Sequence, residues 1–205
     1  MNELTADNLH LWRGEQHVLR GISVAVDGGQ CLQITGSNGT GKTTLLRALC
    51  GLIPLEAGRI CWRGSDVTGD WPAFHGELSY LGHDNGLKAE LTAAENLRYA
   101  AALRCRVHPQ QIAAALERTG MAEAAGQLLR SLSAGQRRRV ALARLLLSGG
   151  SLWLLDEPGS NLDAGGQALL GELLGGHLAG GGTAVVATHQ ALPLPSAQLR
   201  SLQLQ

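Results

Sequence analysis

Eight consecutive residues combine glycines, a lysine and hydroxyl groups at spacings that suit the binding of a polyphosphate. Residues 36–43 read GSNGTGKT, which fits the pattern G-x-x-x-x-G-K-[ST] of a phosphate-binding loop. Glycines let successive backbone N–H groups turn inward around phosphate oxygens. Lys42 would supply a positive charge to the β- and γ-phosphates, and the Thr43 hydroxyl would be a ligand for Mg²⁺. We therefore expect ATP and Mg²⁺ to bind at Gly36, Ser37, Asn38, Gly39, Thr40, Gly41, Lys42, Thr43 and Thr44.

Carboxylates and a histidine follow two apolar segments farther along the chain. Residues 152–155 are LWLL and lead directly into Asp156 and Glu157, and residues 183–187, TAVVA, are followed two residues later by His189. Beside a phosphate-binding loop, an aspartate at the end of a strand holds Mg²⁺, and the next carboxylate can deprotonate an attacking water molecule. His189 can donate a hydrogen bond to the γ-phosphate. We predict three catalytic residues and two metal ligands: Glu157, His189 and Lys42, and Thr43 and Asp156.

A second anion site is predicted at residues 132–136, which read LSAGQ. Ser133 is a good N-terminal cap for a helix, and Gly135 near the helix start would leave backbone N–H groups accessible. The three arginines at residues 137–139 fit either a nucleic-acid patch or a solvated or salt-bridged helix start. The zero net charge of the chain favours the second interpretation.

Strands and helices must place these groups. The apolar run at residues 31–34 precedes the phosphate-binding loop, and a helical pattern follows it at residues 44–50. Residues 78–82 form a further strand candidate that runs into a loop. This succession predicts an α/β fold in which several loops converge on one site.

The N-terminal residues 2–33 alternate in polarity and carry turn signals, which predicts a small antiparallel sheet beside the nucleotide site. Residues 57–64 resemble a short edge strand. Trp12 lies in the first predicted strand. It could stack on an adenine ring, or it could be a core or edge tryptophan, and the local spacing favours neither interpretation.

About 40 residues between two core strands have a helical composition. Thr92 and Glu95 form a capping box, Pro109 suits the first turn of a second helix that Gly120 ends, and residues 121–125 suggest a third helix. This segment could be a spacer. Its position after a loop with titratable residues favours a docking surface.

Composition restricts the possible classes of protein. The chain has 205 residues, enough for one domain, and its 17 Lys and Arg residues balance 17 Asp and Glu residues, which disfavours nucleic acid as a partner. No uninterrupted apolar stretch reaches membrane-spanning length, and the first residues do not resemble a signal peptide. We expect reduced, buried thiols and a cytosolic setting from the scattered cysteines, Cys31, Cys50, Cys61 and Cys105.

Taken in order, these motifs resemble those of ATP-binding cassette (ABC) ATPases over nearly the whole chain. The segments that carry the likeness are residues 36–43, 132–136, 154–158, 160–163 and 188–189. The resemblance implies an α/β P-loop domain over residues 1–205, with a mixed core sheet with helices, a small antiparallel β-subdomain and a helical subdomain inserted at about 84–136. It also implies an ATP-dependent homodimer in which Ser133, Gly135 and Asp163 of one copy complete the site of the other.

One position departs from the ABC pattern and points to a subfamily. The loop after residues 78–82 usually carries a glutamine that touches Mg²⁺ and water, whereas here His83 stands at that place and Asp84 follows it. A neutral imidazole can replace the glutamine as a hydrogen-bond partner, so the resemblance implies His83 as a third residue of the metal site, beside Thr43 and Asp156. Residues 82–97 resemble the haem-exporter ATPases of bacterial cytochrome c maturation. This resemblance implies a peripheral subunit on the cytoplasmic face of the inner membrane, bound only through integral-membrane permease subunits.

Three other functions are weighed against this interpretation. An ATPase subunit for another exported substrate, such as a lipid or drug, shares the same motifs. A soluble ABC regulator of ribosomes or DNA would usually carry two cassettes or a long inserted coiled coil, and this chain has neither. A scaffold that does not hydrolyse ATP is disfavoured by the intact Lys42, Asp156 and Glu157.

Overall fold

The structure is a computed structural model that describes residues 2–103 and 107–204. Its centre is a five-stranded sheet of order β6-β7-β8-β3-β9, in which every neighbouring pair is parallel. The strands are β3 (Cys31–Thr35), β6 (Leu78–Leu81), β7 (Leu152–Asp156), β8 (Thr183–Ala187) and β9 (Leu199–Gln203). Every residue of β7 and β8 is buried, as expected for parallel strands that are covered on both faces.

A second sheet is antiparallel and contains the N-terminus. Its order is β2-β1-β4-β5, from β1 (Asn2–Arg13), β2 (Gln16–Asp27), β4 (Ala57–Trp62) and β5 (Ser65–Asp66). The predicted α/β class and the small antiparallel sheet are confirmed. The core sheet is not mixed, however, because the antiparallel pairs all lie in this separate sheet. β4 is also not the edge strand, since the two residues of β5 pair with its outer side.

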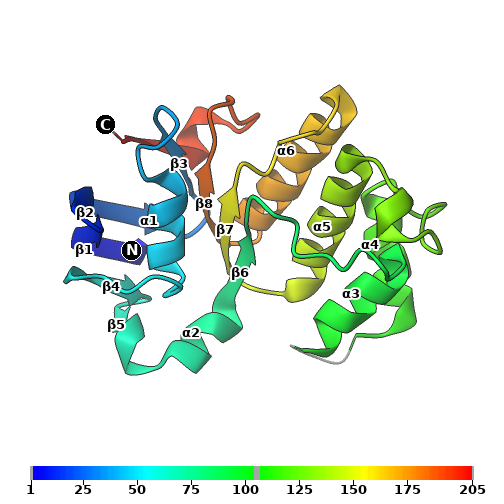
Figure 1. Ribbon diagram of the computed structural model, residues 1–205, viewed down its shortest axis with the longest axis horizontal. Coiled ribbons are helices and arrows are strands. Elements are labelled where there is room, and N and C mark those ends of the chain that lie inside the picture. Colours follow the sequence, from blue (N-terminus) through cyan, green and yellow to red (C-terminus); the bar gives the residue numbers. More distant parts are fainter. Residues whose placement is uncertain (1, 104–106, 205) are drawn as a thin grey trace.

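Helix α1 (Lys42–Leu49) lies between the two sheets (Figure 1). Leu45, Leu46 and Leu49 are fully buried in a cluster that also includes residues of β1, β2, β3, β7 and β8. The helix that follows the phosphate-binding loop is therefore fixed on both sides by apolar packing. The short helices η1 (Val67–Gly69) and α2 (Trp71–Glu77) connect the antiparallel sheet to β6.

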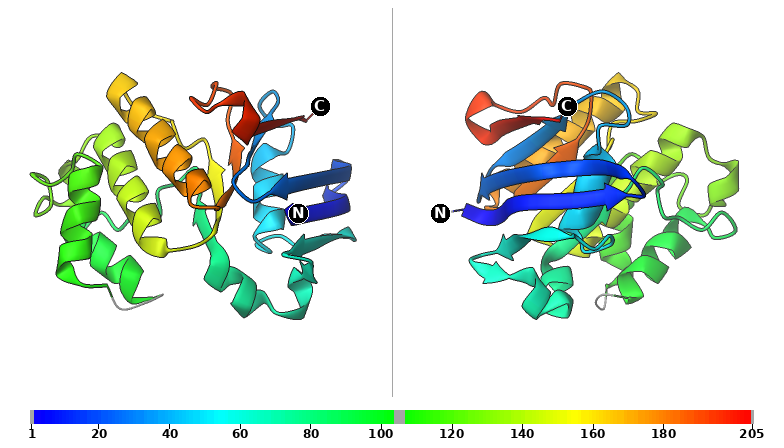
Figure 2. Two further views of the ribbon diagram at one scale, coloured as in Figure 1. Left: turned by 180° about the vertical axis from the view of Figure 1, so that it is seen from behind. Right: turned by 60° about the vertical axis from the view of Figure 1, so that its left-hand side comes forward.

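The other long helices lie on the opposite side of the parallel sheet from α1 (Figures 1 and 2). They are α3 (Ala93–Ala102), α4 (Pro109–Arg118), α5 (Ala134–Ser148) and α6 (Ala164–Ala179), with two short helices, η2 (Leu129–Ser131) and η3 (Ser196–Gln198). α5 packs against both the parallel sheet and the helices α3 and α4. Its Val140 and Ala143 pack with α3 and α4, while Leu142 and Leu145 pack against the parallel sheet. None of the helices among the described residues is both long and apolar enough to cross a membrane.

The predicted third helix at residues 121–125 is wrong. This segment forms successive turns instead, in which the N–H groups of Ala124 and Ala125 donate to the carbonyls of Met121 and Ala122 at 3.1 and 3.2 Å. The turns place the carbonyls of Ala125 and Gln127 beside the start of α3, where they accept from the N–H groups of Ala94 and Ala93 at 2.9 and 3.1 Å. These two bonds satisfy donors that every helix start leaves free. The two predicted starts at Thr92 and Pro109 are confirmed.

Two of the four cysteines, Cys31 and Cys50, are free and buried, and burial raises the pKa of each thiol to about 12. Cys61 is free and partly exposed. Cys105 lies outside the described residues.

Candidate nucleotide-binding site

The phosphate-binding loop connects the end of β3 to the start of α1. Gly41 is the N-terminal cap of α1 with φ +97°, a conformation that side-chain-bearing residues rarely adopt. A Cβ atom at this position would also lie 2.8 Å from a methyl carbon of Val18 in β2. The glycine therefore allows the loop to approach the antiparallel sheet, and the unpaired N–H groups of the first helical turn favour an anion there.

Lys42 is held inside this loop, with 8 % of its surface exposed. Its ammonium group donates hydrogen bonds to the carbonyls of Gly36 and Ser37 at 2.8 and 3.0 Å. The loop is closed by a further bond from the Thr40 hydroxyl to the Ser37 carbonyl at 3.0 Å. These bonds place the charge of Lys42 within the phosphate-binding loop.

Thr43 and Asp156 meet although 113 residues separate them in the chain. The Thr43 hydroxyl donates to Oδ2 of Asp156 at 2.8 Å. Asp156 is 2 % exposed and ends β7, while Thr43 lies in the first turn of α1. A hydroxyl and a carboxylate are oxygen ligands of the kind that Mg²⁺ prefers, and Mg²⁺ usually binds one or two such protein groups together with phosphates and water.

Glu157 and His189 form the other polar pair at this edge of the sheet. Nδ1 of His189 lies 3.1 and 3.2 Å from the two carboxylate oxygens of Glu157. Glu157 has φ +46°, in the left-handed region, and its N–H donates to the carbonyl of Ala187 in β8 at 2.8 Å. The imidazole is 68 % exposed and the carboxylate 20 %, so the pair faces solvent from the sheet edge.

A pocket of about 470 Å³ brings most of these groups together. His83 lines it with the two carboxylates, whereas the neighbouring Asp84 does not. The β1–β2 hairpin contributes three residues that the sequence did not single out and that carry no recognisable motif. The lining residues are Arg13, Gln16, Val18, Asn38, Gly39, Gly41, Lys42, Thr43, Thr44, His83, Asp156 and Glu157.

Trp12 is not among the residues that line this pocket. Its ring stacks on His17 with centroids 4.1 Å apart and is 47 % exposed. A core position is therefore wrong for Trp12, although Arg13, the next residue of β1, does line the pocket.

Several other predicted site residues do not line the pocket: Gly36, Ser37, Thr40, Ser133, Gly135, Asp163 and His189. Ser133 forms a capping box with Gln136, as its N-cap prediction required. A Cβ atom at Gly135 would lie 2.7 Å from the Asn161 carbonyl, so the glycine is needed for close approach of this loop. Asp163 caps α6 through the Gly166 N–H and pairs with Arg139 at 2.8 Å, and these two bonds lower the pKa of Asp163.

The prediction of a solvated or salt-bridged helix start is wrong for Arg138. Arg139 is ion-paired, as expected, but Arg138 is 1 % exposed. Burial lowers its pKa to about 10. A sequence signal was available, because residues 138, 141, 142 and 145 share one helical face and the other three are apolar.

Comparison with known proteins agrees with this geometry. Residues 19–160 match the family model described as ABC transporter. The chain is 44 % identical over 202 residues to the cytochrome c biogenesis ATP-binding export protein CcmA of Dechloromonas aromatica, covering 98 % of this chain and 99 % of that one. The chain belongs to the ABC transporter family, among the CcmA proteins. CcmA of Methylococcus capsulatus is 45 % identical, with 98 % and 97 % coverage, and that of Nitrosococcus oceani 46 %, with 94 % and 87 %.

Solved ABC structures have the same fold. A putative ABC transporter ATP-binding protein from Pyrococcus furiosus superposes with a TM-score of 0.85 at 24 % identity, covering 98 % of this chain and 96 % of that one. The ADP conformation of an ATP-binding cassette gives 0.82 at 22 % identity, covering 100 % and 90 %. As an ABC family member, the chain is a nucleotide-binding, ATP-hydrolysing protein.

Proposed function

We propose that the chain is the ATP-hydrolysing subunit of a membrane complex for cytochrome c maturation, in which ATP hydrolysis drives haem export or the release of a haem-loaded chaperone. The observation that carries this proposal is near full-length identity of about 45 % to several proteins named for cytochrome c biogenesis and export. The geometry supports it, because the phosphate-binding loop, the candidate metal ligands and the candidate base lie together in one pocket. The ATPase would be a single domain over residues 1–205, with its helical subdomain at about 84–136.

In this proposal, different residues of the site bind the phosphates, hold Mg²⁺ and transfer protons. Lys42 and the N–H groups of the loop would bind the β- and γ-phosphates, and Thr43, Asp156 and His83 would hold Mg²⁺ directly or through water. Bound Mg²⁺ would neutralise charge that develops on the phosphates. Glu157 accepts a proton from the attacking water, and His189, already in contact with Glu157, donates to the γ-phosphate.

The position of Ser133, Gly135 and Asp163 outside the pocket supports a two-chain site. In a head-to-tail dimer these groups of one copy would face the ATP held by the phosphate-binding loop of the other. The capped start of α5 offers backbone N–H groups and a favourable helix dipole to that nucleotide. Trp12, which precedes the pocket residue Arg13 in β1, would stack on the adenine with the ring face that His17 leaves uncovered.

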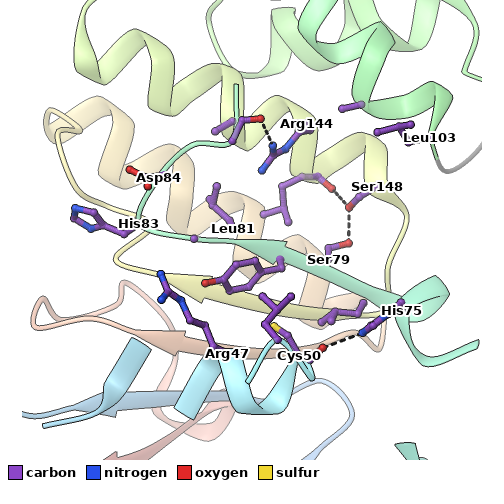
Figure 3. A pocket seen from close by; sticks show the side chains of 18 of the residues that line it. Arg47, Cys50, His75, Ser79, Leu81, His83, Asp84, Leu103, Arg144 and Ser148 are labelled. Atoms are coloured by element: carbon purple, nitrogen blue, oxygen red, sulfur yellow. Dashed lines mark hydrogen bonds between the residues drawn. The ribbon is translucent and has the colours of Figure 1, made fainter. Parts of the chain in front are cut away.

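A larger groove of about 830 Å³ is the proposed contact with the integral-membrane subunits (Figure 3). It lies between β6 and the segments of α1, α2, α3 and α5 that surround it. Leu52 and Leu103, at its rim, are 60 % and 73 % exposed. His83 lines both this groove and the nucleotide pocket, so a segment docked in the groove would lie next to the site of hydrolysis. The chain would thus be peripheral, on the cytoplasmic face of the inner membrane.

Haem staining of c-type cytochromes in the native host tests the proposal. Wild type is compared with Lys42→Ala at equal expression. We expect covalent haem to be lost from c-type cytochromes while other haem proteins stay intact, because the variant lacks the charge that binds the phosphates. Normal c-type cytochromes in the variant would contradict the maturation role and favour an exporter of another substrate.

A further inference from the structure

Arg138 is a fully buried guanidinium with a hydrogen-bond acceptor for each of its five N–H groups. Nε donates to the carbonyl of Pro158 at 3.0 Å. Nη1 donates to the carbonyl of Gly82 and to Oδ1 of Asn85 at 3.1 and 2.9 Å. Nη2 donates to the carbonyls of Asp156 and Glu157 at 2.9 and 2.7 Å. Arginine has five donors in a fixed fork, so this site uses its whole hydrogen-bonding capacity.

These acceptors belong to two separate segments of the site. Three are consecutive carbonyls at residues 156–158, which carry the metal-binding and basic carboxylates. The other two flank His83 in the loop after β6. A single side chain of α5 therefore binds the loop with His83 to the turn with Glu157, although 71 or more positions separate the two segments in the sequence.

The backbone at Glu157 needs such support. Its φ of +46° is unusual for a residue with a side chain, and strained conformations persist only where their surroundings hold them. Its N–H donates to Ala187, and its carbonyl accepts from the Ser160 N–H at 3.0 Å as well as from Arg138. Without the guanidinium, this carbonyl and its two neighbours would lose a buried partner, and the turn would be free to relax. A shift of the turn would move the carboxylate away from the attacking water.

We propose that Arg138 is a positioning residue for ATP hydrolysis: its five-bond fork fixes the turn of Glu157 and the loop of His83 in one arrangement. The inference rests on the proposed role of Glu157 as the base. Arg138 itself does not line the nucleotide pocket, so it acts through the residues that do. Lysine cannot replace it, because an ammonium group keeps the charge but has three donors and no planar fork.

The test is single-turnover hydrolysis of MgATP by the full-length chain, in wild type and in Arg138→Lys. We expect the rate of the chemical step to fall by about a hundredfold, as small displacements of catalytic groups do, while ATP affinity stays close to wild type. Arg130→Gln is the control, because Arg130 is exposed and forms a surface ion pair with Glu90. Its rate should equal that of wild type.

A second background separates positioning from a general effect on the fold. In Glu157→Gln the base is already absent, so adding Arg138→Lys should lower the residual rate by little or nothing. The same hundredfold loss in both backgrounds would overturn the inference, and so would a wild-type rate in Arg138→Lys alone. If Arg138→Lys does not fold, Asn85→Ala is used in its place, because it removes one of the five bonds. It is measured in the wild-type and Glu157→Gln backgrounds, and the same outcomes support or overturn the inference. An inactive wild-type chain would contradict the proposed function itself.

Discussion

Among single residues, His83 connects the nucleotide pocket most directly to the groove that is the proposed contact with the membrane subunits. It lines the pocket that contains Glu157, and it also lines the large groove together with Arg47 and Arg144 (Figure 3). Asp84 follows it in the chain and lines the groove but not the nucleotide pocket. The two neighbours therefore offer a matched comparison of contact with the nucleotide and contact with the partner.

We predict that His83→Ala lowers ATP hydrolysis in the membrane complex by about tenfold, which corresponds to about 1.4 kcal/mol of transition-state stabilisation. The ATP affinity should change much less, because Lys42 and the loop that bind the phosphates remain. Coupled hydrolysis and binding of a fluorescent ATP analogue are measured side by side. Asp84→Asn is the comparison variant and should reduce only the stimulation by the partner. Equal coupled rates in His83→Ala and wild type would remove His83 from the mechanism.

For single residues, the sequence predicted those contacts whose two partners both belong to recognisable motifs. The Thr43–Asp156 hydrogen bond follows from a phosphate-binding loop and a strand-end aspartate, which meet in any parallel sheet of this kind. Arg138 was missed because three consecutive arginines look alike until one face of α5 is recognised as buried. Glu157 was predicted as the base, but its left-handed backbone depends on bonds from α5 and β8 that have no local signal.

At the level of elements, α6 is attached to the sheet by a histidine. His177 stacks on Trp153 of β7 with ring centroids 4.0 Å apart and planes 9° from parallel. Its Nε2 lies 3.1 Å from the carbonyl of Thr183 in β8. Burial lowers the pKa of His177 below its ordinary value of 6.5. The neutral imidazole is therefore the form that the folded protein accommodates.

This pKa shift predicts a loss of stability in mild acid. As the pH falls below about 6.5, the unfolded chain gains a proton at residue 177 while the folded chain resists it, so the free energy of unfolding decreases. The decrease continues until the pH reaches the lower pKa of the folded state. Urea unfolding between pH 7.5 and 5 should show a steeper decline for wild type than for His177→Gln. An equal dependence of the free energy of unfolding on pH in both proteins would contradict a lowered pKa of His177.

Element boundaries were predictable where caps are local. Thr92, Pro109 and Ser133 each mark a helix start as expected. The segment at residues 121–125 was mispredicted as helix because composition alone does not reveal that its backbone bonds close successive turns, one of which presents a carbonyl to the start of α3. Gly135 is a similar case: its contact with the Asn161 carbonyl depends on two segments that are brought together only in the fold.

In the whole molecule, the nucleotide pocket and the larger groove meet at the loop after β6, where His83 lines both. The nucleotide pocket takes residues from the β1–β2 hairpin, the phosphate-binding loop, the β6 loop and the end of β7. The groove takes residues from both sides of β6 and from α5. The fold class could be predicted from motif order, but the groove could not, because it arises from the way α3 and α5 pack beside the sheet.

In the proposed dimer, the site within one chain would be incomplete. Ser133, Gly135 and Asp163 surround a helix start that does not line the pocket of the same chain. ATP would therefore join two copies, and hydrolysis by Glu157 would separate them. Loss of the base alone should leave the joined state stable.

Turnover by Glu157→Gln tests this account most directly. We predict that the variant binds ATP as wild type does, that hydrolysis falls by about 10²- to 10⁴-fold, and that size-exclusion chromatography with MgATP shows a stable dimer. The substitution keeps the size of the side chain and removes only its ability to accept a proton. Steady-state hydrolysis at the wild-type rate would contradict the assignment of Glu157 as the base, and a monomer with bound ATP would contradict the shared site.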